Sequence, residues 1–270
     1  MRVSTYSLGR FVVDGEHGLM THSGFDDWIA QRYEELWPEL FDEALLAATV
    51  QVLAELADGS AALEFGVGTG RIALPLSRAG VPVHGIDVSP AMVARLRTQA
   101  GSSAVDVTIG DFTGARVGKE FGLVYLLRNA ITNLTTRGAQ VNAFRNAAAH
   151  LRAGGYFVIE NYVPAVRALP PGQTTRVFTA TPAHLGYEEY DLAAQIAVSH
   201  HYWAIDGAIE RFSSSHRYVW PSELDLMAQL AGMTRRSRWG GWQREPFTDQ
   251  SPSHVSVWQT NRSSTRDAGG

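Results

Sequence analysis

The sequence predicts an α/β protein built on a doubly wound, mostly parallel sheet with helices on both faces. Five short apolar runs follow one another between residues 61 and 162, at roughly 20-residue spacing, and segments of helical periodicity or loops join them. This alternation is typical of parallel strands with crossover connections. After about residue 170 the pattern changes to alternating strands separated by Gly and Asp turns, which favours antiparallel pairing.

Each element of this fold has a local signal. Residues 26–57 show helical spacing that Pro38 divides into two helices and that Asp58-Gly59 ends. Ser89-Pro90 is an N-cap followed by proline at the first helical position, whereas Pro75 falls inside a helix or near its first turn. The expected strands are AALEF (61–65), VPVHGID (81–87), AVDVTIGD (104–111), FGLVYLL (121–127) and GGYFVIENY (154–162), and the expected helices cover 71–79, 90–100 and 137–152.

The domain organisation follows from these patterns. Residues 1–58 are an N-terminal segment with a helical lid, and residues 59–260 form the core. An antiparallel insertion at about 172–220 adds a small lid, which we expect to extend the same sheet. A helix over 221–230 and a strand at 254–258 follow, and the polar residues 261–270 form a flexible tail.

Composition excludes several classes of function. The 270 residues are 45% hydrophobic and 19% charged, the balance of a globular protein, and the chain has no cysteine. Disulfides, thiolate nucleophiles and Cys-ligated metals are therefore excluded. Lys119 is the only lysine and lies in a loop-like stretch, which disfavours Schiff-base chemistry. The net charge of −4 without a basic run disfavours nucleic acid as a partner. No signal peptide or membrane span is present, so we expect a cytoplasmic protein.

The segment A-L-E-F-G-V-G-T-G-R-I-A carries the chemistry. It predicts a strand, a glycine-rich turn and a helix, in which Gly66, Gly68 and Gly70 let the backbone approach a ligand closely. The third glycine follows the second by two positions, where the nicotinamide fingerprint requires three. Glu64 stands at the end of the strand, and Asp87 ends the next strand, where a carboxylate can bind both ribose hydroxyls.

Residues 60–162 resemble the class I S-adenosylmethionine (SAM)-dependent methyltransferases, of the small-molecule type found in bacterial secondary metabolism. The resemblance rests on E-F-G-V-G-T-G, on G-I-D-V-S-P-A-M-V, on G-D-F at 110–112 and on H-L-R-A-G-G-Y-F-V-I-E at 150–160. It implies a Rossmann-like fold and SAM as the methyl donor, with S-adenosylhomocysteine as the product and no metal.

The resemblance also implies a role for individual residues. Glu64 and the turn from Gly66 to Gly70 would hold the methionine moiety, and Asp87 would bind the ribose. The adenine would lie against Met92, Asp111 and Phe112, and Arg128 and Asn129 would border the methyl group. Methyl transfer is an in-line displacement, so catalysis consists largely of proximity, alignment and exclusion of water.

The acceptor side carries weaker signals. Trp28, Tyr33, Tyr162 and Trp242 fall on segments that cover the donor in this family, and aromatic walls suit a flat or cationic acceptor. We therefore expect a small heteroaromatic metabolite such as an indole, methylated on carbon or nitrogen. Tyr33, Glu160 and Tyr162 are the candidate catalytic residues, and Trp28, Tyr162 and Trp242 the candidate acceptor pocket.

Several alternatives remain open from the sequence. An N-methyltransferase of an amino sugar or another small amine also uses aromatic faces and needs little help from a base. A non-catalytic SAM-binding protein, a nucleic-acid or protein methyltransferase and a nicotinamide dehydrogenase are further possibilities. His200 and His201 point to opposite strand faces and cannot chelate one ion, and the acidic cluster of Glu188, Glu189 and Asp191 is expected to be solvated. We expect a monomer or a homodimer.

Overall fold

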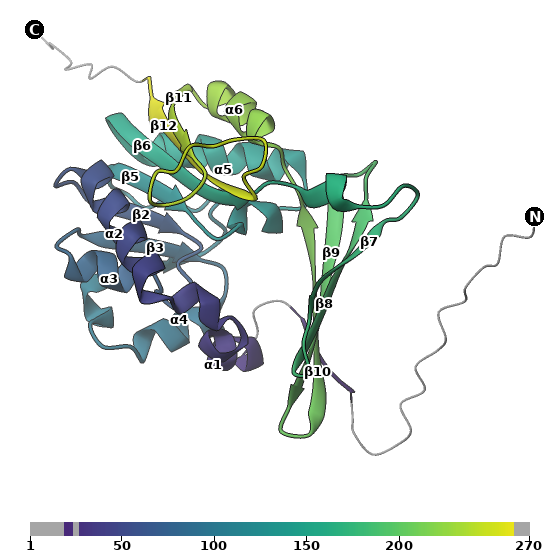
Figure 1. Ribbon diagram of the computed structural model, residues 1–270. Helices are drawn as coiled ribbons and strands as arrows, with labels where there is room; N and C mark the ends of the chain where they lie inside the picture. The colour runs from purple at the N-terminus through teal and green to yellow at the C-terminus, as the bar shows by residue number, and fades with distance from the viewer. Residues whose placement is uncertain (1–18, 24–26, 262–270) are drawn as a thin grey trace, which may run out of the picture.

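Two β-sheets form the framework of the protein. The computed structural model describes residues 19–23 and 27–261. A seven-stranded sheet flanked by helices forms the larger body, and a five-stranded sheet stands beside it (Figure 1). The predicted flexible tail at 261–270 and the first part of the N-terminal segment lie almost wholly outside the described residues.

The larger sheet has the predicted parallel strands at its centre. The order is β11-β12-β6-β5-β2-β3-β4, in which β2, β3, β4, β5 and β6 run parallel and β12 is antiparallel to both of its neighbours, β6 and β11. Because β2 lies between β3 and β5, the chain switches direction of winding at β2, which is where such sheets bind ligands. The bounds are β2 Ala62–Phe65, β3 Val83–Asp87, β4 Val105–Ile109, β5 Phe121–Leu126, β6 Leu151–Tyr162, β11 Met233–Trp239 and β12 Ser253–Thr260.

Helices cover both faces of this sheet, as the sequence predicts. Figure 1 shows α2 and α3 on one face and α5 and α6 on the other, and each face has its own apolar core. Pro75 lies in the first turn of α3, where a missing amide costs no hydrogen bond. No helix among the described residues is long and apolar enough to cross a membrane. The bounds are α1 Asp27–Leu36, η1 Pro38–Phe41, α2 Glu43–Ala57, α3 Ala73–Arg78, α4 Pro90–Arg97, η2 Ser102–Ala104, η3 Ala130–Asn133, α5 Arg137–His150, η4 Ala165–Ala168 and α6 Pro221–Leu230.

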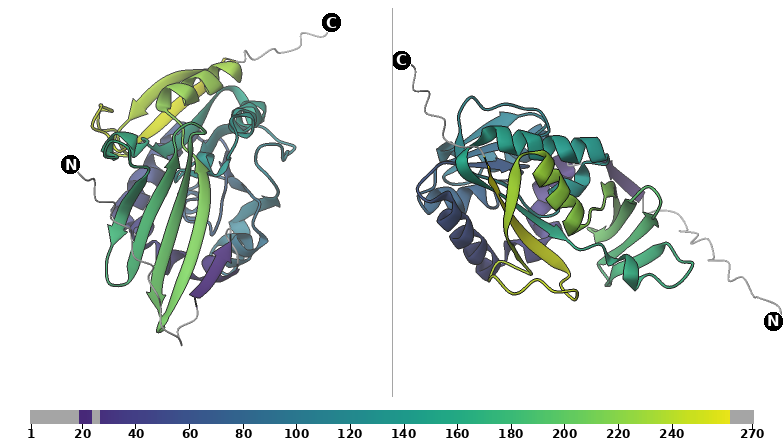
Figure 2. Two further views of the ribbon diagram at one scale, coloured as in Figure 1. Left: turned by 90° about the vertical axis from the view of Figure 1, so that its right-hand side faces the viewer. Right: turned by 90° about the horizontal axis from the view of Figure 1, so that it is seen from above.

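The second sheet differs from the expectation that the antiparallel strands extend the main sheet. Its order is β1-β10-β9-β8-β7, and it faces the viewer in the left panel of Figure 2. The edge beside β6 is occupied by β12, which pairs Ser253 with Tyr162, so no strand of the insertion can add there. The strands are β1 Leu19–Ser23, β7 Thr175–Ala180, β8 His184–Asp191, β9 Ile196–Ile205 and β10 Ala208–Arg217.

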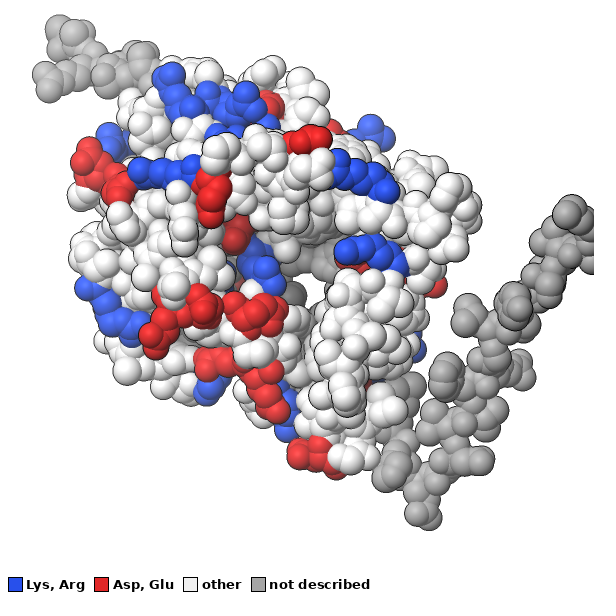
Figure 3. Space-filling model, viewed as in Figure 1, with Lys and Arg blue, Asp and Glu red and all other residues white. Residues whose placement is uncertain are grey.

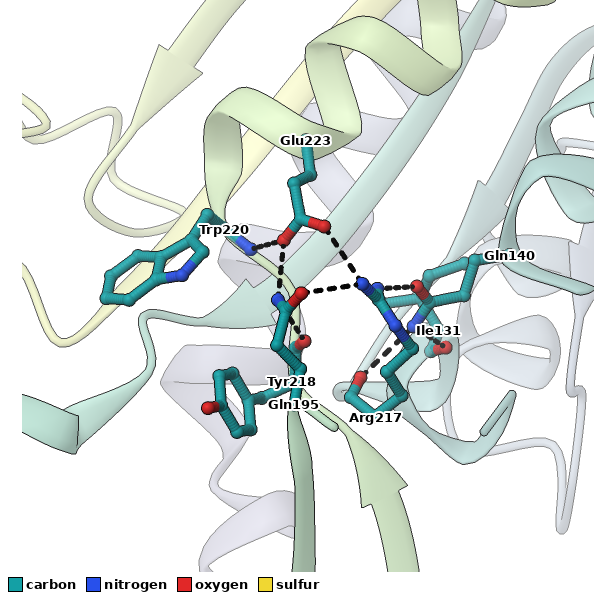
Figure 4. Close-up of polar contacts among 7 residues, drawn as sticks. All are labelled: Ile131, Gln140, Gln195, Arg217, Tyr218, Trp220 and Glu223. Carbon is teal, nitrogen blue, oxygen red and sulfur yellow. Dashed lines mark hydrogen bonds and ion pairs between the residues drawn. The ribbon is translucent and has the colours of Figure 1, made fainter. Parts of the chain in front are cut away.

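A buried arginine joins the second sheet to the main body (Figure 4). Arg217, at the end of β10, donates hydrogen bonds to Gln140 Oε1 on α5 at 2.6 Å and to Gln195 Oε1 at 3.0 Å. It also contacts Glu223 Oε1 on α6 at 3.0 Å. Only 3% of Arg217 is exposed. The network therefore fixes the position of β10 relative to the helices of the main body.

Candidate functional site

A cavity of about 410 Å³ lies at the carboxyl edge of the parallel strands. The residues that follow β2, β3, β4 and β5 line it, and Phe212, Ser214 and Ser215 of β10 close it from the second sheet. Figure 3 shows that the molecule is hollowed between the two sheets. The predicted cofactor residues on this lining are Glu64, Gly66, Gly68, Asp87, Met92, Asp111, Phe112 and Arg128.

The glycine-rich turn brings the backbone to the cavity. Gly66 and Gly68 have φ values of 69° and 53°, a region that side chains other than glycine rarely adopt. A Cβ on Gly68 would lie 3.3 Å from Met92 Cε. Gly70 does not line the cavity, but a Cβ there would come within 3.0 Å of Leu74 and Leu96, so this glycine permits close packing of the turn on its helices.

Glu64 is a buried carboxyl group on the cavity wall. Only 5% of the residue is exposed, and Tyr125 donates a hydrogen bond to Glu64 Oε2 at 3.0 Å. Burial raises the pKa of Glu64 to about 8, against the opposing effects of Tyr125 and Arg71. A buried carboxyl group of this kind gains from a cationic ligand, because opposite charge favours ionisation.

Two further polar residues, Asp87 and Thr69, lie at the wall of the cavity. Asp87 Oδ2 accepts from Gly68 N at 2.7 Å and Oδ1 accepts from Ser89 N at 2.8 Å, which fixes the carboxylate at the cavity edge. Burial raises the pKa of Asp87, although these backbone hydrogen bonds lower it. Thr69 lines the same cavity, and its buried Oγ1 has no partner among the described residues.

The remaining walls of the cavity are formed by the apolar side chains of Met92 and Phe112 and by the carboxylate of Asp111. Phe112 stacks on Phe65 with ring centroids 5.4 Å apart, and Met92 is 5% exposed. Asp111 Oδ1 accepts a hydrogen bond from Thr113 N at 2.8 Å. Together these residues form a slot that suits a flat ring with a polar edge.

A second cavity of about 220 Å³ adjoins the first. It lies between α1, η1, η3 and the strands β8, β9 and β10, and its polar lining includes Glu188, His201 and His216. Five residues line both cavities and therefore mark their junction: Tyr33, Arg128, Asn133, Phe212 and Ser214.

The end of β5 has an unusual backbone at this junction. Arg128 and Asn129 have φ values of 53° and 60°, and such left-handed conformations in non-glycine residues are held by their surroundings. Arg128 N donates to Glu160 Oε2 at 3.0 Å, and Asn129 Oδ1 accepts from Tyr162 N at 2.8 Å. Asn129 lines the second cavity and not the first.

The structure brings only some of the candidate catalytic and acceptor residues together. Tyr33 lines both cavities and Tyr162 lines the second, whereas Trp28, Glu160 and Trp242 line neither. Trp242 Nε1 donates to Glu160 Oε1 at 2.9 Å, so the carboxylate is held by this indole and by the backbone amide of Arg128, just after β5. Trp28 packs against Trp203 in the cluster between α1 and the second sheet.

Comparisons with known proteins agree with this geometry. A family model described as a methyltransferase domain matches residues 62–155, whereas none of the curated protein sequences matches the chain. Among solved structures, the CcbJ methyltransferase from Streptomyces caelestis is 32% identical, with a TM-score of 0.78. The match covers 88% of this chain and 98% of that chain. This chain belongs to the SAM-dependent methyltransferase family.

Two solved structures of lower identity share the fold of this methyltransferase. CalS10 from Micromonospora echinaspora, an amino pentose methyltransferase, is 21% identical with a TM-score of 0.63, covering 84% of this chain and 95% of that one. The sugar N-methyltransferase KedS8 from Streptoalloteichus is 18% identical with a TM-score of 0.60, covering 95% and 98%.

The first cavity of the methyltransferase fits SAM. The buried Glu64 carboxyl suits the donor's ammonium group, and Asp87 suits the ribose hydroxyls. The slot of Met92, Phe112 and Asp111 suits the adenine. When bound, SAM supplies an electrophilic methyl group, and the residues of the chain have only to hold it in line with the acceptor and exclude water.

Sequence reasoning missed the contribution of the second sheet. Phe212, Ser214 and His216 alternate in F-S-S-S-H, which places them on one face of a strand, but nothing local shows which face meets the cavities. Arg71 was also missed; it follows the glycine-rich turn and donates to Leu40 O at 3.2 Å. His201 lines the second cavity, whereas His200 lies on the outer face beside Glu189, as the strand periodicity predicts.

Proposed function

We propose that this methyltransferase moves the methyl group of SAM to the nitrogen of a small amine natural product held in the second cavity. The observation that carries the proposal is the position of Glu188, a carboxylate on the wall of the cavity that adjoins the donor cavity. A carboxylate in a partly enclosed cavity attracts an amine-bearing ligand and repels an anionic one.

The neighbours of Glu188 hold its carboxylate in place. Tyr190 donates to Glu188 Oε2 at 2.5 Å, Ser199 donates to Oε1 at 3.4 Å, and Arg176 Nη1 lies 3.9 Å from Oε2. The two histidines of the cavity do not oppose a cationic ligand, because burial lowers the pKa of His201 to about 3 and that of His216 to about 4. Both imidazoles are therefore neutral near pH 7. The guanidinium of Arg128, which also lines the cavity, is paired with Glu39 Oε1 at 3.5 Å.

The outer surface supports the same class of acceptor. Acidic side chains gather over α1 and the start of α2, near the hollow in Figure 3. Glu34, Glu35, Glu39, Asp42 and Glu43 belong to this group and are exposed. Arg95 pairs with Glu34 and Arg128 with Glu39, but the five carboxylates outnumber these two arginines. A rim of net negative charge raises the local concentration of a positively charged ligand. The names of CalS10 and KedS8, an amino pentose methyltransferase and a sugar N-methyltransferase, point in the same direction.

A flat heteroaromatic acceptor such as an indole is the second candidate. Trp37 and Phe212, in edge-to-face contact at 6.3 Å, line the second cavity together with Tyr33 and could stack a ring. The case is weaker than the sequence alone indicates, because Trp28 and Trp242 do not line the cavity.

One panel of acceptors separates the two candidates. Amino sugars, cyclic secondary amines and indoles are each incubated with SAM, and transfer is scored by a mass gain of one methyl group. We expect turnover of amines, with a raised KM in Glu188→Gln and unchanged affinity for S-adenosylhomocysteine. Turnover of indoles alone would reject the amine proposal.

A further inference from the structure

We propose that Ser214 is a positioning residue that accepts a hydrogen bond from the N–H of the methyl acceptor, and that His216 and Thr132 fix it in this role. The inference rests on the proposed function, because it assigns the contact that orients the amine. Ser214, His216 and Thr132 lie outside the parallel sheet, and none of them belongs to the donor motifs of the sequence.

Ser214 lies where the methyl group must pass. It is one of the five residues that line both cavities, and His216 lines the second. Both residues are on β10 and are separated by two positions, so their side chains share one face of the strand. Ser214 Oγ lies 2.7 Å from His216 Nε2, a distance typical of a strong hydrogen bond.

The direction of this hydrogen bond follows from Thr132. The Thr132 hydroxyl donates its hydrogen to Asn129 O at 2.7 Å. Its oxygen, 3.4 Å from His216 Nδ1, is therefore left to accept. His216 then carries its hydrogen on Nδ1, which leaves Nε2 as an acceptor for the Ser214 hydroxyl. The chain of donors runs from Ser214 through His216 and Thr132 to the carbonyl of Asn129.

Asn129, at the end of this series of hydrogen bonds, is held in place by its surroundings, and His216 is neutral. Asn129 has a left-handed backbone and is tied to β6 by the hydrogen bond from Tyr162 N. Thr132 is 1% exposed. Burial lowers the pKa of His216 to about 4, so the imidazole does not become a double donor near neutral pH.

The consequence is that Ser214 presents lone pairs, and not a hydrogen, to the junction. An acceptor N–H that binds there directs the nitrogen's own lone pair away from Ser214 and toward the methyl group. The amine reacts as its free base, after its ammonium proton has passed to water. In the transfer the N–C bond forms as the S–C bond breaks, and the positive charge passes from sulfur to nitrogen. The N–H hydrogen stays on nitrogen, where Ser214 Oγ stabilises the developing charge.

The binding test needs no methyl acceptor. Its probe is sinefungin, a SAM analogue in which an amino-bearing carbon replaces the methylated sulfur, and the reference is S-adenosylhomocysteine. We expect Ser214→Ala to weaken sinefungin about tenfold, because a charged donor loses its acceptor, and to leave the reference within about twofold. The control is Ser213→Ala, since Ser213 Oγ lies 2.9 Å from His200 Nδ1 on the outer face. Equal losses for both ligands, or no loss for sinefungin, would overturn the proposal.

A spectroscopic test addresses the series of hydrogen bonds from Ser214 to Asn129. In ¹⁵N-histidine NMR at pH 7, we expect His216 to be neutral with its hydrogen on Nδ1. Thr132→Val, which removes the hydroxyl and keeps the shape, should shift the tautomer, and Thr132→Ser should restore it. A hydrogen on Nε2 in the wild-type protein would contradict the proposal. Neither test depends on the acceptor panel, so a failure of the amine proposal in that panel remains distinguishable.

Discussion

At the scale of single residues, the donor cavity depends on carboxyl groups whose ionisation is set by burial. Glu64 is buried beside Tyr125, and burial raises its pKa to about 8. Asp87 is held by two backbone amides, so its orientation is fixed before any ligand arrives. We therefore expect the two residues to contribute differently to donor binding, Glu64 through its charge and Asp87 through its fixed orientation.

Donor binding is expected to release a proton from Glu64. Without the donor this carboxyl is mostly protonated below pH 8, and a neighbouring ammonium group lowers its pKa, so binding ionises it and tightens as the pH rises toward 8. Calorimetry of S-adenosylhomocysteine binding at pH 7, in buffers of different ionisation enthalpy, measures the number of protons released on binding. Glu64→Gln should abolish the release. Proton release that is unchanged in this variant would place the titrating group elsewhere.

Asp87→Ala is expected to weaken donor binding by about 1.5–3 kcal/mol, the range for hydrogen bonds to a charged group. Asp87→Asn, which keeps one oxygen acceptor, should have a smaller effect. Both affinities are measured by calorimetry with S-adenosylhomocysteine, and circular dichroism checks that the turn at Gly68 remains folded. Wild-type affinity in the alanine variant would show that Asp87 does not bind the ribose.

At the scale of elements, Arg217 connects β10 to α5 and α6 through its guanidinium and through its backbone carbonyl, which accepts from Gln140 Nε2 at 3.1 Å (Figure 4). Desolvation raises the pKa of Glu223, but hydrogen bonds from Trp220 N, Arg217 and Gln195 outweigh this effect and hold the pKa below its usual value of 4.5. The ionised carboxylate is therefore favoured in the folded state. Its contribution to stability is present above pH 4.5 and is lost as the pH falls through the lowered pKa.

Glu223→Gln is expected to reduce the free energy of unfolding by about 2–4 kcal/mol at pH 7, because it leaves the buried Arg217 without its carboxylate. The difference from wild type should shrink as the pH falls below 4.5. Urea unfolding across this range measures both effects. Leu226→Ala, at a position on α6 that is 59% exposed, is the control and should change little. A pH-independent difference would show that the charge of Glu223 is not what stabilises the network.

At the scale of the whole molecule, the donor cavity lies between two bodies that fold around different cores. Residues of the parallel sheet form most of its lining, and β10 contributes Phe212, Ser214 and Ser215. The helix α1 also belongs to both, since Tyr33 lines the cavity and Ile29 packs against Trp203 and Phe212 of the second sheet. We therefore expect a donor bound in this cavity to contact both bodies at once.

S-adenosylhomocysteine at about 100 times its Kd is expected to raise the free energy of unfolding by about 2.7 kcal/mol. Because both bodies line the cavity, hydrogen exchange should slow in β10 as well as in the turn after β2. Exchange measured by mass spectrometry with and without the ligand tests this distribution. Protection confined to the parallel sheet would show that the second sheet does not close on the donor.

The fold of the main body could be predicted because its signals are local. Apolar runs, the N-cap at Ser89 and the turn at Asp58 locate strands and helices independently of the rest of the chain. The roles expected for Trp28, Glu160 and Trp242 had no such support, since strand-end position and aromatic character do not show which neighbour a side chain meets. Trp242 and Glu160 contact one another, and both lie outside the cavities.

The sequence by itself determined the parallel sheet and the glycine-rich turn that we expect to bind the donor, because glycine conformation and strand periodicity depend on nearby residues. Only the tertiary structure decided the acceptor side. Thr132 and His216 lie 84 positions apart, and their contact depends on how β10 packs against η3. An alternating strand offers two faces of similar polarity, and packing against the rest of the chain selects the one that meets the donor.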